Sequence, residues 1–219
     1  LEKAETRVAV EDIYRPYRPK RRTRATAARE KGLEPLADLI WAQRTDHPLE
    51  QDAASFVSAE KEVDSPEQAL AGAGDILAER ISDEALYRAE IRRRTMQSGV
   101  LRSAAKDEKA QSVYEMYYEF EEAVSKIAGH RILAVNRGEK EKYLTVKIEA
   151  PEEEILRYLE KKVILRENPY TAPMLRSVIA DSYRRLIAPA IEREIRSELT
   201  ERAEDGAIRV FGKNLEQLL

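Results

Sequence analysis

The chain has 219 residues, and its 38 Lys and Arg nearly balance its 41 Asp and Glu, which leaves a formal net charge of −3. A chain so close to neutral has no overall attraction for nucleic acid, so any such attraction must come from local clusters of basic residues. The absence of cysteine excludes disulfides, thiolate catalysis and every cysteine-ligated zinc or iron–sulfur site.

Residues 1–112 are predicted to form a helical subdomain that contains one basic segment. The chain opens with the end of a helix, which Pro16 and Pro19 stop. We expect the residues between these prolines to be extended, because a residue before proline avoids the α conformation. Thr23 is suited to cap the next helix, which ends at Gly32.

Further helices are predicted over residues 33–44 and 49–59. Ser65 followed by Pro66 is a helix start signal, and the helix that follows, straight or bent at 72–74, runs to about residue 81. Another helix is expected from residue 82 to about residue 97, and residues 99–109 read as a loop or a short strand.

Residues 113–172 are predicted to form a helix, a β-hairpin and a second helix. The first helix, over 113–127, is rich in tyrosine. The hairpin, at about 131–148, joins two aliphatic runs, 131–136 and 143–148, through a turn that contains Gly138.

The last part of the chain, residues 173–219, is predicted to contain paired helices with a boundary at Pro189. The helix after Pro189 would have about 30 residues and a length of roughly 45 Å. The predicted fold class is therefore mainly α, with helical subdomains joined by a long helix and one small β-hairpin. The chain begins at Leu1 and stops within this helical pattern, so we expect it to be part of a longer protein.

The basic segment at residues 14–24 is the strongest candidate for a binding site. Lysine and arginine can neutralise phosphates, and interleaved tyrosine rings can stack on bases. The candidate nucleic-acid-binding residues are Tyr14, Arg15, Tyr17, Arg18, Lys20, Arg21, Arg22 and Arg24. The alternative is structural: the arginines pair with acidic neighbouring helices, and the tyrosines pack on the core.

No other pattern indicates catalysis. His47 and His130 are isolated in the sequence, and the acidic clusters at 119–122 and 152–154 are typical of solvated helix faces. There is no phosphate-cradling glycine loop, nucleophile elbow or kinase motif. We therefore predict no catalytic residue, no metal site and no cofactor in this chain.

Three ordered blocks of sequence resemble the Tex family of bacterial transcription accessory proteins. The first combines EDIYRPYRPKRRTRA (residues 11–25) with AREKGLEPLA (28–37), and the second, HRILAVNRGE (130–139), resembles a hairpin motif. The third is similar to the long central helix of the family and contains YRRLI (183–187), IERE (191–194) and AIRVFGKNL (207–215).

The resemblance implies a bacterial, cytoplasmic protein related to a eukaryotic elongation factor that also acts as a histone chaperone. In the family, a helical region precedes a ribonuclease-H-like domain, helix-hairpin-helix elements and an S1 domain, all of which this chain lacks. The family's binding to RNA or DNA is expected to reside mainly in those domains. RNA polymerase or other transcription proteins are hypothesised as further partners. No stretch of the sequence approaches the eighteen or so consecutive apolar residues of a membrane-spanning helix, so we expect no membrane partner.

Three functions follow as hypotheses. The first is a helical scaffold within a nucleic-acid-binding transcription accessory protein. The second is a protein–protein docking scaffold for the transcription machinery whose basic segment is purely structural. The third, a nuclease, is disfavoured because the sequence offers no metal-binding carboxylate set with a partner base.

Overall fold

The computed structural model describes residues 7–17 and 22–218, and it confirms a mainly α fold with one small sheet. The chain forms two compact units, each assembled from two separate segments. Unit 1 contains residues 1–90 and 153–188, and unit 2 contains residues 91–152 and 189–219. The division at 112/113 and 172/173 stays a prediction about boundaries along the chain.

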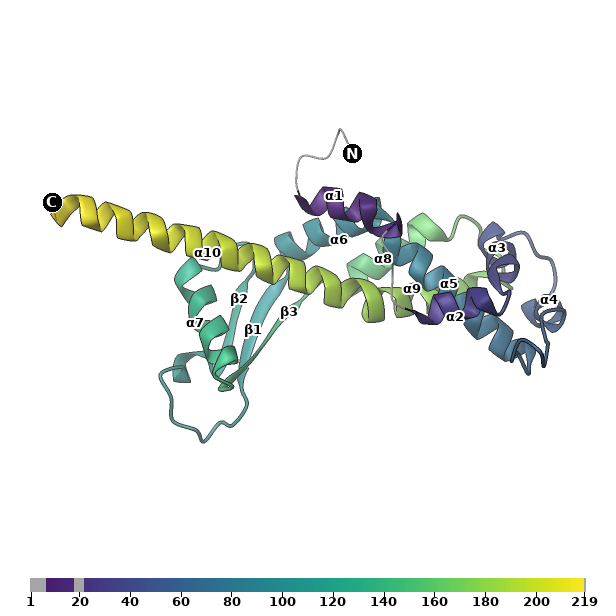
Figure 1. Ribbon diagram of the computed structural model, residues 1–219, viewed down its shortest axis with the longest axis horizontal. Helices are drawn as coiled ribbons and strands as arrows, with labels where there is room; N and C mark the ends of the chain where they lie inside the picture. The colour runs from purple at the N-terminus through teal and green to yellow at the C-terminus, as the bar shows by residue number, and fades with distance from the viewer. Residues whose placement is uncertain (1–6, 18–21, 219) are drawn as a thin grey trace. The chain divides into compact units, whose positions relative to one another are not determined.

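Unit 1 is built of helices (Figure 1). It contains α1 (Arg7–Tyr14), the 3₁₀ turn η1 (Arg15–Tyr17), α2 (Arg24–Glu30), α3 (Glu34–Ala42), α4 (Leu49–Ala54), α5 (Pro66–Asp83), the first part of α6 (Ala85–Ser98), nearly all of α8 (Glu152–Val163), α9 (Ala172–Asp181) and the π-helical turn η3 (Ser182–Ile187).

Helix α5 is the centre of unit 1, and α2, α3, α4, α9 and η3 all pack against it. Its start is the predicted one: the Ser65 hydroxyl accepts a hydrogen bond from the Gln68 backbone N–H at 3.3 Å. The helix continues without a break through Gly72 and Gly74. Ile76, Leu77 and other residues along it are fully buried, each contributing roughly 1.5–3 kcal/mol.

Unit 2 combines a three-stranded antiparallel sheet with helices. It contains the second part of α6, β1 (Val100–Ala105), the 3₁₀ turn η2 (Glu115–Tyr117), β2 (Glu119–Ala123), α7 (Gly129–Lys140), β3 (Leu144–Glu149) and nearly all of α10 (Ala188–Leu218). The strand order is β2-β1-β3 (Figure 1), and α7 packs against β3.

The sheet has one buried and one exposed face. In β3, Leu144, Val146 and Ile148 point into the core, and the residues between them are exposed. On the exposed face Arg102 of β1 bridges two carboxylates, Glu121 at 3.1 Å and Glu149 at 2.8 Å. The alternation and the cross-strand charge pairs together define the register of the strands.

Side chains from two helices cover the outer edge of β3. Glu192 of α10 accepts a hydrogen bond from the Ile148 N–H at 2.9 Å, and Glu139 of α7 accepts one from the Val146 N–H at 3.3 Å. Arg196 bonds Glu139 and also donates to the Val146 carbonyl at 3.4 Å. These contacts satisfy backbone groups that an edge strand would otherwise present to another chain.

The predicted hairpin is wrong in its first strand. Residues 131–136 lie in helix α7, and only the second run, now β3, is a strand. The buried positions Ile132, Val135 and Gly138 recur every three residues, which is the pattern of a helix face. A Cβ on Gly138 would lie 2.6 Å from Leu144 Cδ1, so the glycine allows α7 to pack closely on β3.

The predicted helix over 113–127 is also wrong. This segment forms η2 and then β2, which pairs with β1 along its whole length. Tyr117 is buried, and its ring meets Phe120 edge to face at 5.2 Å. The strand option for 99–109 is confirmed by β1.

At the predicted boundary near Pro189 the chain changes from a π-helical turn to an α-helix, and it does not leave the helical conformation. The Ala188 N–H bonds the Tyr183 carbonyl, five residues back, and this wider turn directly precedes the proline. Helix α10 has 31 residues, as the predicted length required. The described part of the chain contains no helix with a stretch of apolar residues sufficient to span a lipid bilayer.

Two glycines of α5 give a test of its packing. A Cβ on Gly72 would lie 2.4 Å from Leu33 Cδ1, and Leu33 is buried, whereas a Cβ on Gly74 would meet its neighbours at ordinary distances of 3.5 and 3.6 Å. We expect Gly72→Ala to destabilise the fold by about 1–3 kcal/mol through overpacking. Gly74→Ala is the control and should be neutral or stabilising by about 0.5–1 kcal/mol. Urea unfolding followed by circular dichroism measures both, and equal effects would contradict this account of the packing.

His47 predicts a pH dependence. Its ring nitrogens lie 2.9 Å from Asp46 Oδ1 and 3.0 Å from Asp52 Oδ1, and hydrogen bonds to Asp52 and Asp46 raise the pKa of His47. A raised folded-state pKa stabilises the fold below the unfolded pKa of about 6.5, and the effect is lost as the pH rises through the folded value. His47→Gln should therefore lower stability in mildly acidic buffer and have no effect in alkaline buffer. A pH-independent difference in urea midpoints would disprove this.

Candidate nucleic-acid interface

The basic segment begins at the end of α1 and ends at the start of α2. Tyr14 is the last residue of α1, Arg15 and Tyr17 lie in η1, and Arg24 is the first residue of α2. A 3₁₀ turn thus replaces part of the extended conformation expected from the prolines. The predicted residues Arg18, Lys20 and Arg21 lie outside the described part of the chain.

Thr23 fixes the C-terminal end of the segment. Its hydroxyl accepts a hydrogen bond from the Thr26 backbone N–H at 3.0 Å, which confirms the predicted N-cap of α2. The same hydroxyl donates to Glu79 Oε2 of α5 at 3.0 Å. A single side chain therefore caps α2 and ties it to the central helix of unit 1.

Arg15 is held by α5, and Arg22 lies near the solvent. Arg15 Nε lies 3.3 Å from Asp83 Oδ1, a partly buried carboxylate of α5. Arg22 Nη2 lies 2.8 Å from Glu30 Oε2, but the Arg22 side chain is 74% exposed. Such an exposed ion pair contributes at most about 1 kcal/mol, so Arg22 can exchange its partner for a phosphate at little cost.

The remaining described residues of the segment are open to solvent. Tyr17 is 78% exposed and Tyr14 is 52% exposed, so neither ring is buried in the core. Arg24 is exposed, and its charge acts on two carboxylates of unit 1, Asp75 and Asp181. The pKa of Asp181 is lowered, first by its hydrogen bond with Arg185 and then by the charges of Arg185 and Arg24, against the opposing effect of burial.

Acidic residues of α5 form the surface next to the segment. Glu79, whose side chain is 12% exposed, accepts a second bond from Arg29 Nη1 at 2.8 Å. The pKa of Arg29 is raised: burial opposes its charge, but the hydrogen bonds and charges of Glu79 and Glu34 outweigh that effect. A hollow of about 530 Å³ beside Pro16 is lined by Thr26, Arg29, Glu79, Arg80, Asp83 and Glu84.

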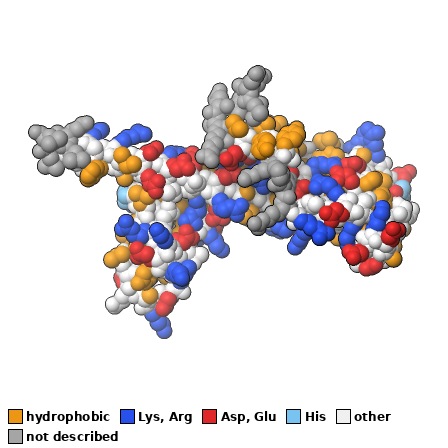
Figure 2. All heavy atoms as spheres, viewed as in Figure 1, with side chains coloured by type: hydrophobic (Ala, Val, Ile, Leu, Met, Phe, Trp, Pro, Cys, Tyr) orange, Lys and Arg blue, Asp and Glu red, His pale blue; other side chains and the backbone are white. Residues whose placement is uncertain are grey.

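Neither unit is uniformly basic on the side that Figure 2 displays. Lys and Arg side chains there are interspersed with Asp and Glu. Arg80, for example, pairs with Asp38 at 2.7 Å and lies over the Trp41 ring at 5.5 Å. The basic segment therefore lies in a surface of mixed charge.

The partners of the segment were not predicted from the sequence. Glu79 and Asp83 are four residues apart on α5, so they lie on the same face of that helix. This spacing is visible in the sequence, but the sequence does not show which residues these carboxylates bind. Thr23 lies 56 positions before Glu79, and Arg15 lies 68 positions before Asp83.

Neither histidine belongs to the basic segment or lies among its partners on α5. His47 bonds two aspartates before α4, and His130 is exposed near the start of α7. In the part of the chain that the structure describes, no three or more His, Asp or Glu residues are grouped so that they could hold a metal ion.

Comparison with known proteins identifies the family. Residues 44–211 match the family described as Tex central region-like. The chain belongs to this family. This match begins after the basic segment and covers most of the helices and the sheet of both units.

Relatives of the chain extend from bacteria to animals. The chain is 51% identical to the uncharacterized protein YdcI of Bacillus subtilis over 96% of its length, and 30% identical to the transcriptional accessory protein Tex of Neisseria gonorrhoeae over 100%. It is 30% identical to the human S1 RNA-binding domain-containing protein 1 over 96% of its length. The chain spans 30% of each bacterial relative and 22% of the human one.

Thr23 gives a test of how the segment is held. We expect Thr23→Ala to destabilise unit 1 by about 1–2 kcal/mol, because it removes the cap of α2 and leaves Glu79 without one hydrogen bond. Thr23→Ser keeps the hydroxyl and should retain most of the stability. Denaturant unfolding compares the two variants. If both lose the same amount, the methyl group rather than the hydroxyl is responsible.

Proposed function

We propose that this chain is the helical scaffold of a cytoplasmic, nucleic-acid-binding transcription accessory protein. Its membership of the Tex family carries the proposal, supported by relatives named a transcriptional accessory protein and an S1 RNA-binding domain-containing protein. The relatives cited bear no enzyme name, and we assign no catalytic step to the chain. RNA or DNA would be held mainly by other parts of the full protein.

The basic segment would add an electrostatic contribution to that binding. Arg22 and Arg24 are exposed and lie within three residues of each other, and the Tyr14 and Tyr17 rings have faces on which bases can stack. Arg15 has a structural role in this proposal, because its partner Asp83 lies on the central helix. The proposed contact residues are therefore those of the predicted cluster other than Arg15. They are Tyr14, Tyr17, Arg18, Lys20, Arg21, Arg22 and Arg24.

A second candidate function is docking of RNA polymerase or other transcription proteins without nucleic-acid contact by this chain. The bonds that join Arg15, Thr23 and Arg29 to α5 favour it, because they use part of the segment for internal structure. The two functions differ in how binding depends on salt.

Titration of labelled single-stranded RNA and DNA at several salt concentrations tests the first function. Binding should weaken as salt rises, since each phosphate contact to a single strand contributes about 0.7 to the slope of log K against log salt. Reversal of charge at Arg18, Arg21, Arg22 and Arg24 should reduce that slope. A slope that stays unchanged would remove the segment from the interface and favour the docking function.

A matched variant controls for overall charge. Arg157, Arg166, Arg193 and Arg202 are exposed and lie far from the segment in sequence, and reversing all four changes the net charge by the same amount. This variant should keep the slope of the unmodified chain. Equal losses in both variants would indicate general electrostatic attraction rather than a site.

A further inference from the structure

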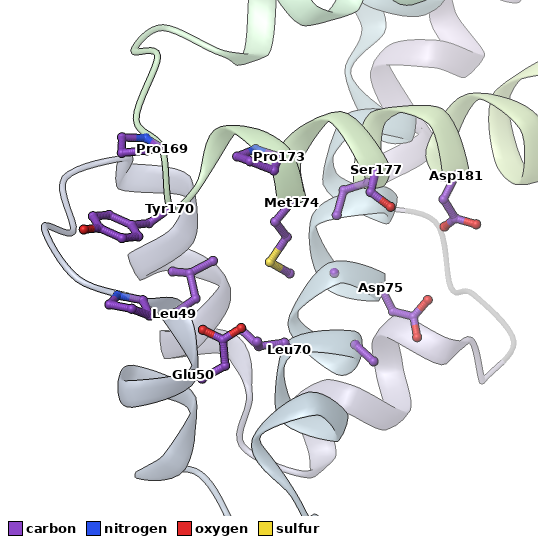
Figure 3. Close-up of a pocket in the computed structure, with 14 residues that line it drawn as sticks. Leu49, Glu50, Leu70, Asp75, Pro169, Tyr170, Pro173, Met174, Ser177 and Asp181 are labelled. Atoms are coloured by element: carbon purple, nitrogen blue, oxygen red, sulfur yellow. The ribbon is translucent and has the colours of Figure 1, made fainter.

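An apolar groove crosses the surface of unit 1 away from the buried contacts of the basic segment. It lies between α4, α5, α9 and the residues that precede α9, and its volume is about 570 Å³ (Figure 3). Leu49, Leu70, Met174 and Val178 supply apolar lining, and Tyr170, which is 38% exposed, lies at one end beside Pro169.

Small residues of α5 keep the groove open. Ala71 and Gly74 line it one turn apart on the helix. Ala71 is exposed, so a larger side chain there would project into the groove rather than into the core. A Cβ on Gly74 would lie at ordinary contact distances of 3.5 and 3.6 Å from the Val178 and Met174 side chains, so α5 and α9 approach each other closely at the floor of the groove.

The charges around the groove have one predominant sign. Among the described residues that line the groove, three are carboxylates, Glu50, Asp75 and Asp181, and none is Lys or Arg (Figure 3). Arg185 pairs with Asp75 at 3.2 Å and with Asp181 at 2.6 Å. The charge of Arg24 also acts on both aspartates, so the two arginines offset part of this negative charge. Glu50, at the opposite side, is exposed.

We propose that this groove binds a cationic segment of a partner protein, which inserts one bulky apolar side chain between α4, α5 and α9. The apolar lining would receive that side chain, and Glu50 together with the Asp75 and Asp181 pair would attract flanking Lys or Arg residues. Phosphate backbones carry the wrong charge for this rim, which separates the groove from the nucleic-acid function proposed above. The inference gives a partner chemistry to the docking function and stands apart from the role of the basic segment.

Fluorescence anisotropy of the full chain with labelled synthetic peptides tests the proposal. The probe has a central Leu flanked by lysines; two control peptides replace the Leu by Ala or the lysines by Glu. We expect the probe to bind and both controls to bind at least about tenfold more weakly, since apolar burial and charge each contribute. Equal binding of the Ala peptide or of the Glu peptide would overturn the proposal.

Variants of the chain locate the binding. Ala71→Phe fills the groove and should lower the affinity for the probe peptide by about tenfold or more. Glu50→Lys should lower this affinity by about three- to fivefold. Glu60→Lys alters an exposed carboxylate outside the groove and should bind as the unmodified chain does. Circular dichroism checks that each variant is folded.

Other outcomes would contradict the proposal or assign a different occupant to the groove. Unchanged binding by Ala71→Phe, or equal loss in Glu60→Lys, would overturn the proposal. Self-association of the chain that Ala71→Phe abolishes, seen by analytical ultracentrifugation without peptide, would assign the groove to a second copy instead. RNA binding that Ala71→Phe abolishes would overturn the assignment to a protein partner. A variant reversed only at Arg18, Arg21 and Arg22 keeps Arg24, whose charge acts on Asp75 and Asp181. This variant should still bind the probe, so failure of the nucleic-acid function would leave this result unaffected.

Discussion

Burial of a carboxylate in α5 is the interaction on which unit 1 depends. Helices pack around α5 on several sides, so Glu79 cannot turn fully toward water, and a buried carboxylate without partners would be strongly destabilising. Thr23 and Arg29 supply the partners at 3.0 and 2.8 Å. Because Thr23 also caps α2, the start of α2 is tied to the hydrogen bond that Glu79 accepts on α5.

The carboxylates of α5 lie on different faces of the helix. Glu79 and Asp83 face the basic segment, whereas Asp75, one turn before Glu79, lines the apolar groove. Burial raises the pKa of Asp75, against the lowering effect of the Arg185 and Arg24 charges. Arginines thus offset carboxylates on both faces, and the net charge of −3 says little about the potential at either surface.

The sequence alone was sufficient to predict secondary structure where a local rule decides it. Caps such as Thr23 and Ser65 act within four residues, and the length of α10 follows from its own periodicity. It was insufficient for the strands, because aliphatic runs of five or six residues suit either a buried helix face or a strand. The choice for residues 131–136 depended on Gly138 and on β3, against which α7 packs, and that contact belongs to the tertiary structure.

The candidate site shows the same limit at the level of single residues. The sequence identified a basic, tyrosine-rich cluster, but a count of cations cannot separate those that bind α5 from those that face water. Arg15 and Arg22 are seven residues apart, yet one pairs with a partly buried aspartate of a distant helix and the other with an exposed glutamate eight residues along the chain. Removing Arg15 would disturb the fold as well as any ligand, whereas removing Arg22 would mainly change the charge presented to solvent. The function of such a segment is therefore best assigned by comparing residues with different partners inside it, and not by deleting the segment as a whole.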